Sequence, residues 1–567
     1  MSLGLARLLM QWLLAFINFS CKVSGTQFGA FHQPLVSERT TTMASEATGT
    51  PPTERRPPTP KDWLPGLAQN FKSDAVSGLV IFLIALPLCL AIANASGVPP
   101  IAGIISGIIA GTLANLFSGS YVTINGPAAG MIVIVAGAVA EIGYAQALAV
   151  GVVAGAIQVV LALLKSGKLT GFFPLAVVHG MLAGIGLIIM AGQIHIALGR
   201  PNPREHGFHI LTAIPPTLAN LVGETALVGV AAVAIMIVWP RFTTAAKLAP
   251  APLVAVVVGT GIAVLNGAEP TLDLAGGLLE GFAAPDFSDI LSGPAIKWVV
   301  LYVFVASLES LLTAEAVDKL DPYKRRSNMN RELLGKGVGN MVSSALGGLP
   351  MIAEVVRSKA NILAGARTRW SNFFHGVFLA LFVLAAPGLL ELIPLAALAG
   401  VLLVVGFKLA HPRDFLHALH VGKFEFLIML VTALTVLFTD LLIGVATGIA
   451  LALVVSLIRG GSPANLFKVK MTVAEEEDDT IRVVLRGVLG FHNFIELRAT
   501  LDGLPAGRTV VLDFTKVHYV DPTVLERVFD FQAAYTEEGG TVVRVGEQNL
   551  RPAGLHEFSA RTAAKAA

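Results

Sequence analysis

The sequence predicts an α-helical polytopic membrane protein that ends in a small α/β domain. The chain has 567 residues, of which 54% are hydrophobic and only 14% charged, and its mean hydropathy is +0.72. A chain with this composition places much of its length in lipid. Apolar stretches alternate with short polar connections from residue 75 to 460. After Arg459 the sequence becomes charged, and short alternating stretches flank a helical pattern, as in α/β domains.

About fourteen of the apolar stretches are expected to span the membrane. Several are shorter than the roughly 20 residues that a straight spanning helix needs. Short spans are tolerated where broken helices line a cavity inside the protein. The predicted spans are residues 75–95, 99–117, 123–141, 145–164, 175–198, 217–239, 250–266, 295–317, 331–348, 350–364, 373–392, 394–409, 422–440 and 441–458.

Two segments broken by Gly and Pro occupy corresponding places in the two halves of this region. They are residues 123–130, Thr-Ile-Asn-Gly-Pro-Ala-Ala-Gly, and residues 347–357, Gly-Gly-Leu-Pro-Met-Ile-Ala-Glu-Val-Val-Arg. Each is expected to run extended and then to turn directly into a helix at membrane depth. A helix N-terminus offers unpaired N–H groups and a partial positive charge. Two such ends facing each other form an anion site, as in secondary transporters built from inverted repeats. The sequence therefore predicts a carrier of a small anion.

The charges of the connections predict the orientation in the membrane. One side is basic, for example at Lys319, Lys324 and Arg325, and the other carries acids such as Glu391 and Asp440. The basic side is expected to be cytoplasmic by the positive-inside rule. With an even number of spans, both termini are then cytoplasmic. We expect a multi-pass protein of the inner (plasma) membrane.

Composition also excludes several classes of function. The net charge is only +2, so no nucleic-acid partner is expected. The two cysteines, Cys21 and Cys89, cannot form a disulfide scaffold or a cysteine-based metal site. The histidines lack metal-ligand spacing, and no Walker-type phosphate loop is present. We expect no metal, no cofactor and no enzymatic activity.

The first 60 residues are expected to be an extension and a linker outside the transport domain. The apolar run from Leu3 to Phe19 resembles a signal peptide or a short anchor. The Ser/Thr/Pro-rich stretch from Ser37 to Pro60 is typical of a disordered linker. The favoured interpretation is that Met43 is the true start and that the preceding residues are a mis-assigned extension.

Motifs spread along the chain resemble those of the sulfate permease (SulP) family of anion transporters with a C-terminal STAS domain. The motifs are Ala85–Leu88, Asn125–Pro127, Ser307–Thr313, Asn330–Leu333 with Gly339 and Asn340, and the segment 347–357. The resemblance extends from about Asp62 to Pro552. It implies a seven-plus-seven inverted repeat with uracil-permease-like core and gate domains, in a homodimer. The corresponding boundaries are residues 61–460 for transport and 466–560 for the STAS domain.

Carried over onto this sequence, the resemblance assigns an anion site to the third and tenth spans. The substrate-binding residues are expected to be Ala128, Ala129, Ala353, Glu354, Val355 and Arg357. Arg357 follows Glu354 by three residues, so the two side chains can pair on one helical face. An Arg inside a span is costly and is by default functional.

Glu309 is the candidate for cation coupling, with Thr313 one turn later on the same face of an otherwise apolar helix. Desolvation favours the protonated form of a carboxylate, which suits it to exchange a proton. The family resemblance implies that this acidic position couples transport to protons or sodium. Glu354 is an extra carboxylate beside the anion site, and it favours protons because it must be protonated or paired.

Sulfate is the expected substrate. A sodium-coupled bicarbonate transporter and a C4-dicarboxylate/proton symporter are the alternatives. Bicarbonate-type relatives tend to carry hydroxyl residues at the positions of Ala128 and Val355, which this chain lacks. In the STAS-like region, Pro522 stands where phosphorylated relatives have Ser, so a dimer contact or the docking of a regulatory protein is expected there instead of a phosphorylation switch.

Overall fold

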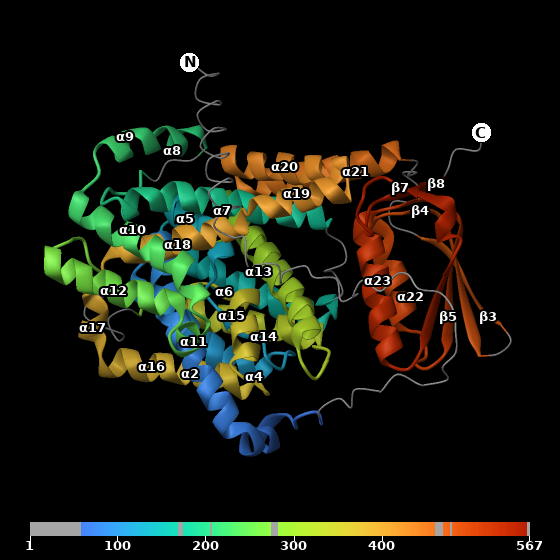
Figure 1. The fold of residues 1–567 in the computed structure, drawn as a ribbon, viewed down its shortest axis with the longest axis horizontal. Helices are drawn as coiled ribbons and strands as arrows, with labels where there is room; N and C mark the ends of the chain where they lie inside the picture. Colours follow the sequence, from blue (N-terminus) through green and yellow to red (C-terminus); the bar gives the residue numbers. More distant parts are fainter. Residues whose placement is uncertain are drawn as a thin grey trace. The chain divides into compact units, whose positions relative to one another are not determined.

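The computed structural model describes residues 58–167, 174–203, 207–273, 282–459, 469–476 and 479–563. The predictions for residues 1–57, including the choice between Met1 and Met43, lie outside the described residues. Residues 466–468, at the start of the expected C-terminal domain, also lie outside them. The described residues form a helical region and a C-terminal sheet domain (Figure 1).

Within the described residues, eight helices are long and apolar enough to cross a membrane, and three shorter apolar helices accompany them. The polar ends of several helices are capped as their sequences allow. Asn328 accepts a hydrogen bond from the backbone N–H of Arg331, and Asp440 accepts one from Ile443. These side chains satisfy amides that the first helical turn leaves unpaired. The predicted helical membrane fold is confirmed.

The helical elements follow the same order in the two halves of the chain. The first half contains α2 (Trp63–Ala95), α3 (Pro100–Ile109) continued by η1 (Ala110–Ala114) and α4 (Asn115–Phe117), β1 (Ile124–Gly126) with α5 (Ala129–Ile142), α6 (Tyr144–Leu163), α7 (Leu175–Ala197), α10 (Gly223–Val238) and α12 (Ala251–Asn266). The second half contains α13 (Gly293–Leu320), α14 (Met329–Ala345), β2 (Ile352–Glu354) with α15 (Val355–Leu363), α16 (Trp370–Ala385), α18 (Leu395–Leu409), α20 (Lys423–Phe438) and α21 (Leu441–Ile458). Each predicted span overlaps one of these elements.

Short helices connect the longer ones. They are α8 (Phe208–Thr212), α9 (Ile214–Ala219), η3 (Trp239–Arg241), α11 (Thr243–Leu248), α17 (Pro387–Glu391) and α19 (Pro412–Val421). The helices pack in two groups. The core group contains α2–α6 and α13–α16, and the gate group contains α7, α10, α12, α18, α20 and α21. Each half of the chain supplies its first four elements to the core group and its last three to the gate group.

The two strands meet inside the core group as an antiparallel pair. Ile124 lies opposite Glu354, Asn125 opposite Ala353, and Gly126 opposite Ile352. The strands form part of the third element in each half of the chain. An approximate two-fold relation between the halves therefore makes the strands antiparallel. The pairing also satisfies backbone groups that would otherwise be unbonded in an apolar interior.

The C-terminal domain is a mixed sheet with two helices packed on it (Figure 1). Its elements are β3 (Lys470–Glu476), β4 (Thr480–Leu489), η5 (Phe491–Asn493), α22 (Phe494–Asp502), β5 (Thr509–Val520), α23 (Pro522–Glu537), β6 (Thr541–Val545), η6 (Glu547–Asn549), β7 (Leu550–Pro552) and β8 (Arg561–Ala563). β5 pairs in parallel with β4 and β6. Asp521 caps α23, and Pro522 occupies its first turn, where the missing N–H costs nothing.

Glycines allow α6 and α14 to approach until their backbones touch. A β-carbon on Gly155 would lie 2.7 Å from the carbonyl oxygen of Gly337, and one on Gly337 would lie 2.8 Å from that of Gly155. Small residues at such crossings let transmembrane helices pack closely. This crossing fixes α14 against α6, a core-group helix from the first half of the chain. α14 also lies beside both strands.

We therefore expect Gly337→Ala to destabilise the protein by about 1–3 kcal/mol, because the added methyl group must separate two backbones. Gly261→Ala is the matched control, since a β-carbon there meets no atom within 4 Å among the described residues. That control is expected to be neutral or slightly stabilising. Thermal unfolding of the detergent-solubilised protein measures both changes. Equal melting temperatures for the two variants would contradict the close crossing.

Candidate anion site

The two helix starts of the core group are built alike. Ala128 is the N-cap of α5 and Glu354 is the N-cap of α15, and each has extended backbone before the helix begins. Neither N-cap side chain caps its helix in the described structure. Apart from the N–H of Met131, which donates to the carbonyl of Ala128 at 3.0 Å, the first-turn amides therefore keep their capacity to bind an oxygen atom. As the sequence predicted, each broken segment is extended and then becomes a helix, at once after β2 and after two further residues, Pro127 and Ala128, in the case of β1.

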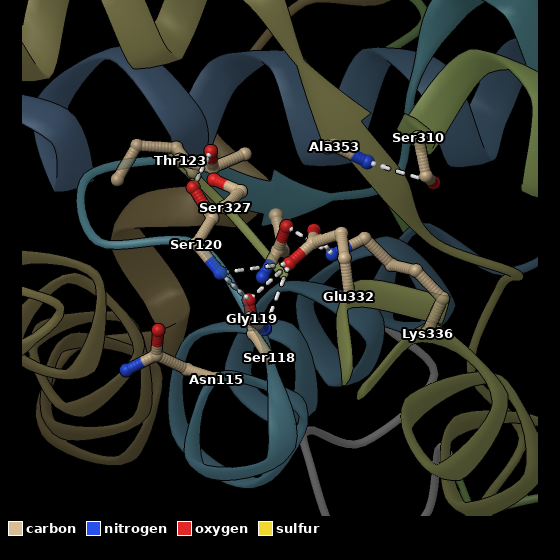
Figure 2. A network of polar contacts seen from close by, with 12 residues as sticks. Asn115, Ser118, Gly119, Ser120, Thr123, Ser310, Ser327, Glu332, Lys336 and Ala353 are labelled. Carbon is tan, nitrogen blue, oxygen red and sulfur yellow. Dashed lines mark hydrogen bonds and ion pairs between the residues drawn. The ribbon is translucent and has the colours of Figure 1, made fainter. Parts of the chain in front are cut away.

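The small residues expected at the site lie at these two helix starts. Ala128 and Ala353 are buried, and Ala129 and Val355, the first residues of α5 and α15, are half-buried. The backbone N–H of Ala353 donates to the hydroxyl of Ser310 on α13 at 3.2 Å, as Figure 2 shows. The strand pairing thus brings Ala128, Ala129, Ala353 and Val355 into one region.

Arg357 is fully buried and paired. Its Nε atom lies 2.8 Å from Oε2 of Glu354, although the two atoms lack the alignment of a hydrogen bond. Its Nη2 atom donates to the backbone carbonyl of Pro127 at 3.0 Å. A β-carbon on Gly126 would lie 2.6 Å from Nη1 of Arg357, so the guanidinium needs a glycine at that position. Arg357 thereby ties the first turn of α15 to the segment that enters α5.

Two further residues of α15 hold the same segment. The backbone N–H of Ile124 donates to the hydroxyl of Ser358 at 2.9 Å, and the side-chain amide of Asn361 donates to the carbonyl of Val122, also at 2.9 Å. Both polar side chains are completely buried. The approach to α5 is therefore fixed by one face of α15, and the two helix starts form a single unit.

Glu309 lies against the start of α5. A β-carbon on Gly130 would overlap both carboxylate oxygens of Glu309, so this carboxylate occupies space beside the first helical turn. Its Oε1 atom is buried and, like Oε1 of Glu354, has no hydrogen-bond partner among the described residues. Buried polar atoms normally have partners, and exceptions are common at functional sites. Thr313 is buried one turn further along α13.

Sequence analysis missed a buried lysine beside the site. Lys336 on α14 is completely buried, and its Nζ atom donates to Oδ1 of Asn125 at 2.6 Å and contacts Oε1 of Glu332. Glu332 in turn accepts hydrogen bonds from the backbone of Gly119 and Ser120 at 3.2 Å and from the hydroxyl of Ser118 (Figure 2). A lysine inside a predicted span was the available signal, because intramembrane charges are by default functional.

A cavity of about 340 Å³ lies where the core and gate groups meet. It follows α5 from Val133 to Glu141 and is faced by Ile188 and Val436 of the gate group. Lys297 and Asp440 also line it, and Lys297 pairs with Glu141 at 2.6 Å. Among the described residues, no group of three or more His, Cys, Asp or Glu side chains could hold a metal ion.

Comparison with known proteins identifies the family of this fold. The chain is 29% identical over 506 residues to YvdB of Bacillus subtilis (strain 168), which is named for sulfate transport, covering 86% of this chain and 94% of YvdB. It is 31% identical over 430 residues to the bicarbonate transporter BicA of Picosynechococcus sp. (strain ATCC 27264 / PCC 7002 / PR-6), covering 73% of this chain and 75% of BicA.

Solved structures agree. The transmembrane domain of a cyanobacterial bicarbonate transporter BicA matches 67% of this chain and 98% of that domain, with a TM-score of 0.58 and 28% identity. The structure of SLC26A9 matches 85% of each chain with a TM-score of 0.61, and at 15% identity it shows the fold alone. The relatives are transporters by name, not enzymes. The profile of the sulfate permease family covers residues 71–432, and the chain belongs to this family of anion transporters.

Proposed function

We propose that this protein is a secondary active transporter that moves sulfate together with protons by alternating access. The anion would be held between the N-termini of α5 and α15. The observation that carries the proposal is the meeting of these two uncapped helix starts with Arg357, Glu354 and Glu309 in one buried region. Helix N-termini bind oxyanions through backbone N–H groups and do not require a cofactor.

The charges at the site favour binding an anion together with protons. Each helix N-terminus contributes about +0.5 of an elementary charge. With Arg357 ionised and both Glu309 and Glu354 ionised, the sum is close to zero. A doubly charged sulfate would then leave a large net negative charge in a buried place, which is strongly unfavourable. Protonation of the carboxylates offsets this charge, so protons and sulfate bind better together than either does alone.

The position of Glu309 supports a direct coupling of protons to the anion. Its carboxylate lies beside the first turn of α5, where the anion is expected to bind. An ionised Glu309 would therefore repel the substrate and compete with it for the positive helix end. Protonation removes the negative charge and the competition. Thr313 is buried one turn further along the same helix and would help to keep this part of α13 in place.

The arrangement of the helices supports alternating access. The site belongs to the core group, and the cavity along α5 separates part of that group from the gate group. Movement of the core group past the gate group would carry the anion from one side to the other, as in transporters with inverted repeats. The cavity would then close on one side as the opposite side opens.

Bicarbonate transport with sodium is the second candidate, because the chain is 31% identical to a protein named as a bicarbonate transporter. Against it, Ala128 and Val355 offer no hydroxyl group to the substrate. A C4-dicarboxylate/proton symporter remains the third. Backbone amides at two helix ends can receive any of these oxyanions, so transport measurements must separate them.

We also propose the location and domain organisation. The protein would lie in the inner (plasma) membrane as a homodimer with both termini in the cytoplasm. Residues 61–460 would form the transport domain, and residues 466–560 would form a STAS domain that docks a regulatory protein. The parallel strands β4, β5 and β6, together with α22 and α23, support the assignment of a STAS domain. At the start of α23, Thr523 is the nearest hydroxyl after Pro522, and it is buried.

Uptake of labelled sulfate into proteoliposomes tests the proposal. An inward proton gradient, an inward sodium gradient and no gradient are compared, with unlabelled bicarbonate or fumarate as competitor. Accumulation that requires the proton gradient and resists both competitors is expected. Sodium-dependent uptake blocked by bicarbonate would favour the second candidate, and inhibition by fumarate would favour the third.

Glu309→Gln is expected to abolish proton-driven accumulation of sulfate, because the glutamine cannot take up or release a proton. Exchange of labelled for unlabelled sulfate across the vesicle should persist, because the site is then permanently uncharged at this position. Glu224→Gln is the matched control, since Glu224 is exposed in the first turn of α10. Accumulation in Glu309→Gln at the wild-type level would remove Glu309 from the coupling mechanism.

Arg357→Ala is expected to raise the apparent KM for sulfate by about fivefold to tenfold, because a charged hydrogen-bonding group beside the anion is lost. Glu354→Gln combined with Arg357→Ala should restore part of the loss, since the unpaired carboxylate is then neutral. Arg369→Ala is the control for removing a buried guanidinium elsewhere, as Arg369 pairs with Asp62. Unchanged kinetics in folded Arg357→Ala would exclude Arg357 from the site.

A further inference from the structure

A stripe of four buried polar residues runs along α14, and none of them belongs to the anion site assigned above. Glu332, Lys336, Asn340 and Ser343 are at most 2% exposed. Their spacing of four, four and three residues puts them on one face of the helix. We call these four residues the α14 polar stripe. Four buried polar groups in a membrane helix are costly unless each has a partner.

Each member of the stripe binds one of the two broken segments or the turn that leads into it. Glu332 accepts from the backbone of Gly119 and Ser120 in the turn that precedes β1 (Figure 2). Lys336 donates to the side chain of Asn125, the central residue of β1. The backbone N–H of Met351, immediately before β2, donates to Oδ1 of Asn340 at 2.6 Å.

Ser343 completes the stripe by donating to the carbonyl of Leu349 at 2.8 Å. The first half of the stripe therefore holds the approach to α5, and the second half holds the approach to α15. The change from one segment to the other occurs between Lys336 and Asn340, which are about 6 Å apart along the helix axis. Because α14 is rigid, it sets how far β1 and β2 are offset from each other along the α14 axis.

We propose that α14 is a spacer that sets the separation of the two helix N-termini, with Lys336 as a positioning residue for the substrate anion. The proposal rests on the anion site proposed above. Lys336 fixes the oxygen of the Asn125 amide, and Asn125 lies directly opposite Ala353 in the strand pair. A shift of β1 along α14 therefore changes the distance between the first turns of α5 and α15.

The choice of a lysine supports positioning over simple packing. An apolar residue of similar length would fill the same space without the cost of a buried charge, because buried ion pairs are seldom more stabilising than apolar replacements. The pair of Lys336 and Glu332 instead supplies directed bonds to Asn125 and to the turn at residues 118–120. Directed hydrogen bonds fix the position of β1 along α14, which apolar packing alone would fix only weakly.

Two variants test the proposal in the full-length protein. Glu332→Gln with Lys336→Met removes the ion pair while keeping side-chain length and leaving no unpaired charge. Asn125→Ala removes the partner of Lys336 and leaves the ion pair intact. Both are expected to raise the apparent KM for sulfate by roughly tenfold to a hundredfold, since small misplacements of binding groups weaken binding strongly. The kcat should change much less.

Combining the variants provides a sharper test. Both remove the same contact, so the triple variant should have a KM no higher than the worse of the two, whereas independent effects would multiply. The matched control is Asp321→Asn with Arg325→Met. That buried ion pair is also four residues apart, and Arg325 bonds to the carbonyl of Arg367. The control is expected to leave the KM unchanged.

A second measurement does not depend on transport. Hydrogen exchange of peptides covering residues 118–130 and 349–356 should be faster in both test variants than in the wild type. In the control, exchange of residues 349–356 should be unchanged, and residues 118–130 are not compared because Arg325 stacks on the ring of Tyr121 at 4.6 Å. An unchanged KM in folded test variants, an equal rise in the control, multiplying effects, or unchanged exchange would each overturn the proposal. If the wild type transports no sulfate, the proposed function fails. The hydrogen-exchange measurement alone then decides whether α14 positions the strands.

Discussion

Backbone groups at two helix breaks must find partners in an apolar interior, and the rest of the transport region is arranged around this requirement. The strands pair with each other first, but three residue pairs cannot satisfy every amide and carbonyl. Ser310 of α13, Asn340 of α14 and Ser358 of α15 each accept a bond from a strand or from the residue before it. Three helices are therefore fixed in place by the same short pair of strands.

Most of the buried charges near the strands are paired with a charge of opposite sign. Glu332 and Lys336 form an ion pair within α14, and Glu354, the N-cap of α15, pairs with Arg357 in the first turn of that helix, so each pair is close to neutral. Among the described residues Glu309 forms no ion pair, and it lies against the start of α5. Neutral pairs leave the helix ends as the attractive elements for an anion. In the proposed mechanism, Glu309 is the group whose protonation would change the charge of the site.

The sequence predicted those features that depend on local residues. Gly and Pro in the segments 123–130 and 347–357 predicted the breaks, and apolar length predicted the spans. The helix spacing of Glu354 and Arg357 predicted their pairing, which the structure confirms. The contact of Lys336 with Asn125 could not be predicted, because the two residues are 211 positions apart and are brought together only by the fold. Strands β3, β7 and β8 and helix α22 of the C-terminal domain were not predicted, since short elements carry weak patterns.

The absence of hydroxyl groups at Ala128 and Val355 gives the positions of the helices added importance. Where side chains contact a substrate, they select it by the number and geometry of their own donors. Here the donors expected at the anion are backbone amides of α5 and α15, which are chemically the same for every oxyanion. Selection must then arise from the distance and angle between the two helix starts. Under the proposed function, contacts that fix this geometry from outside the site, such as those of α14 and α15 with β1, would become part of the specificity of the transporter.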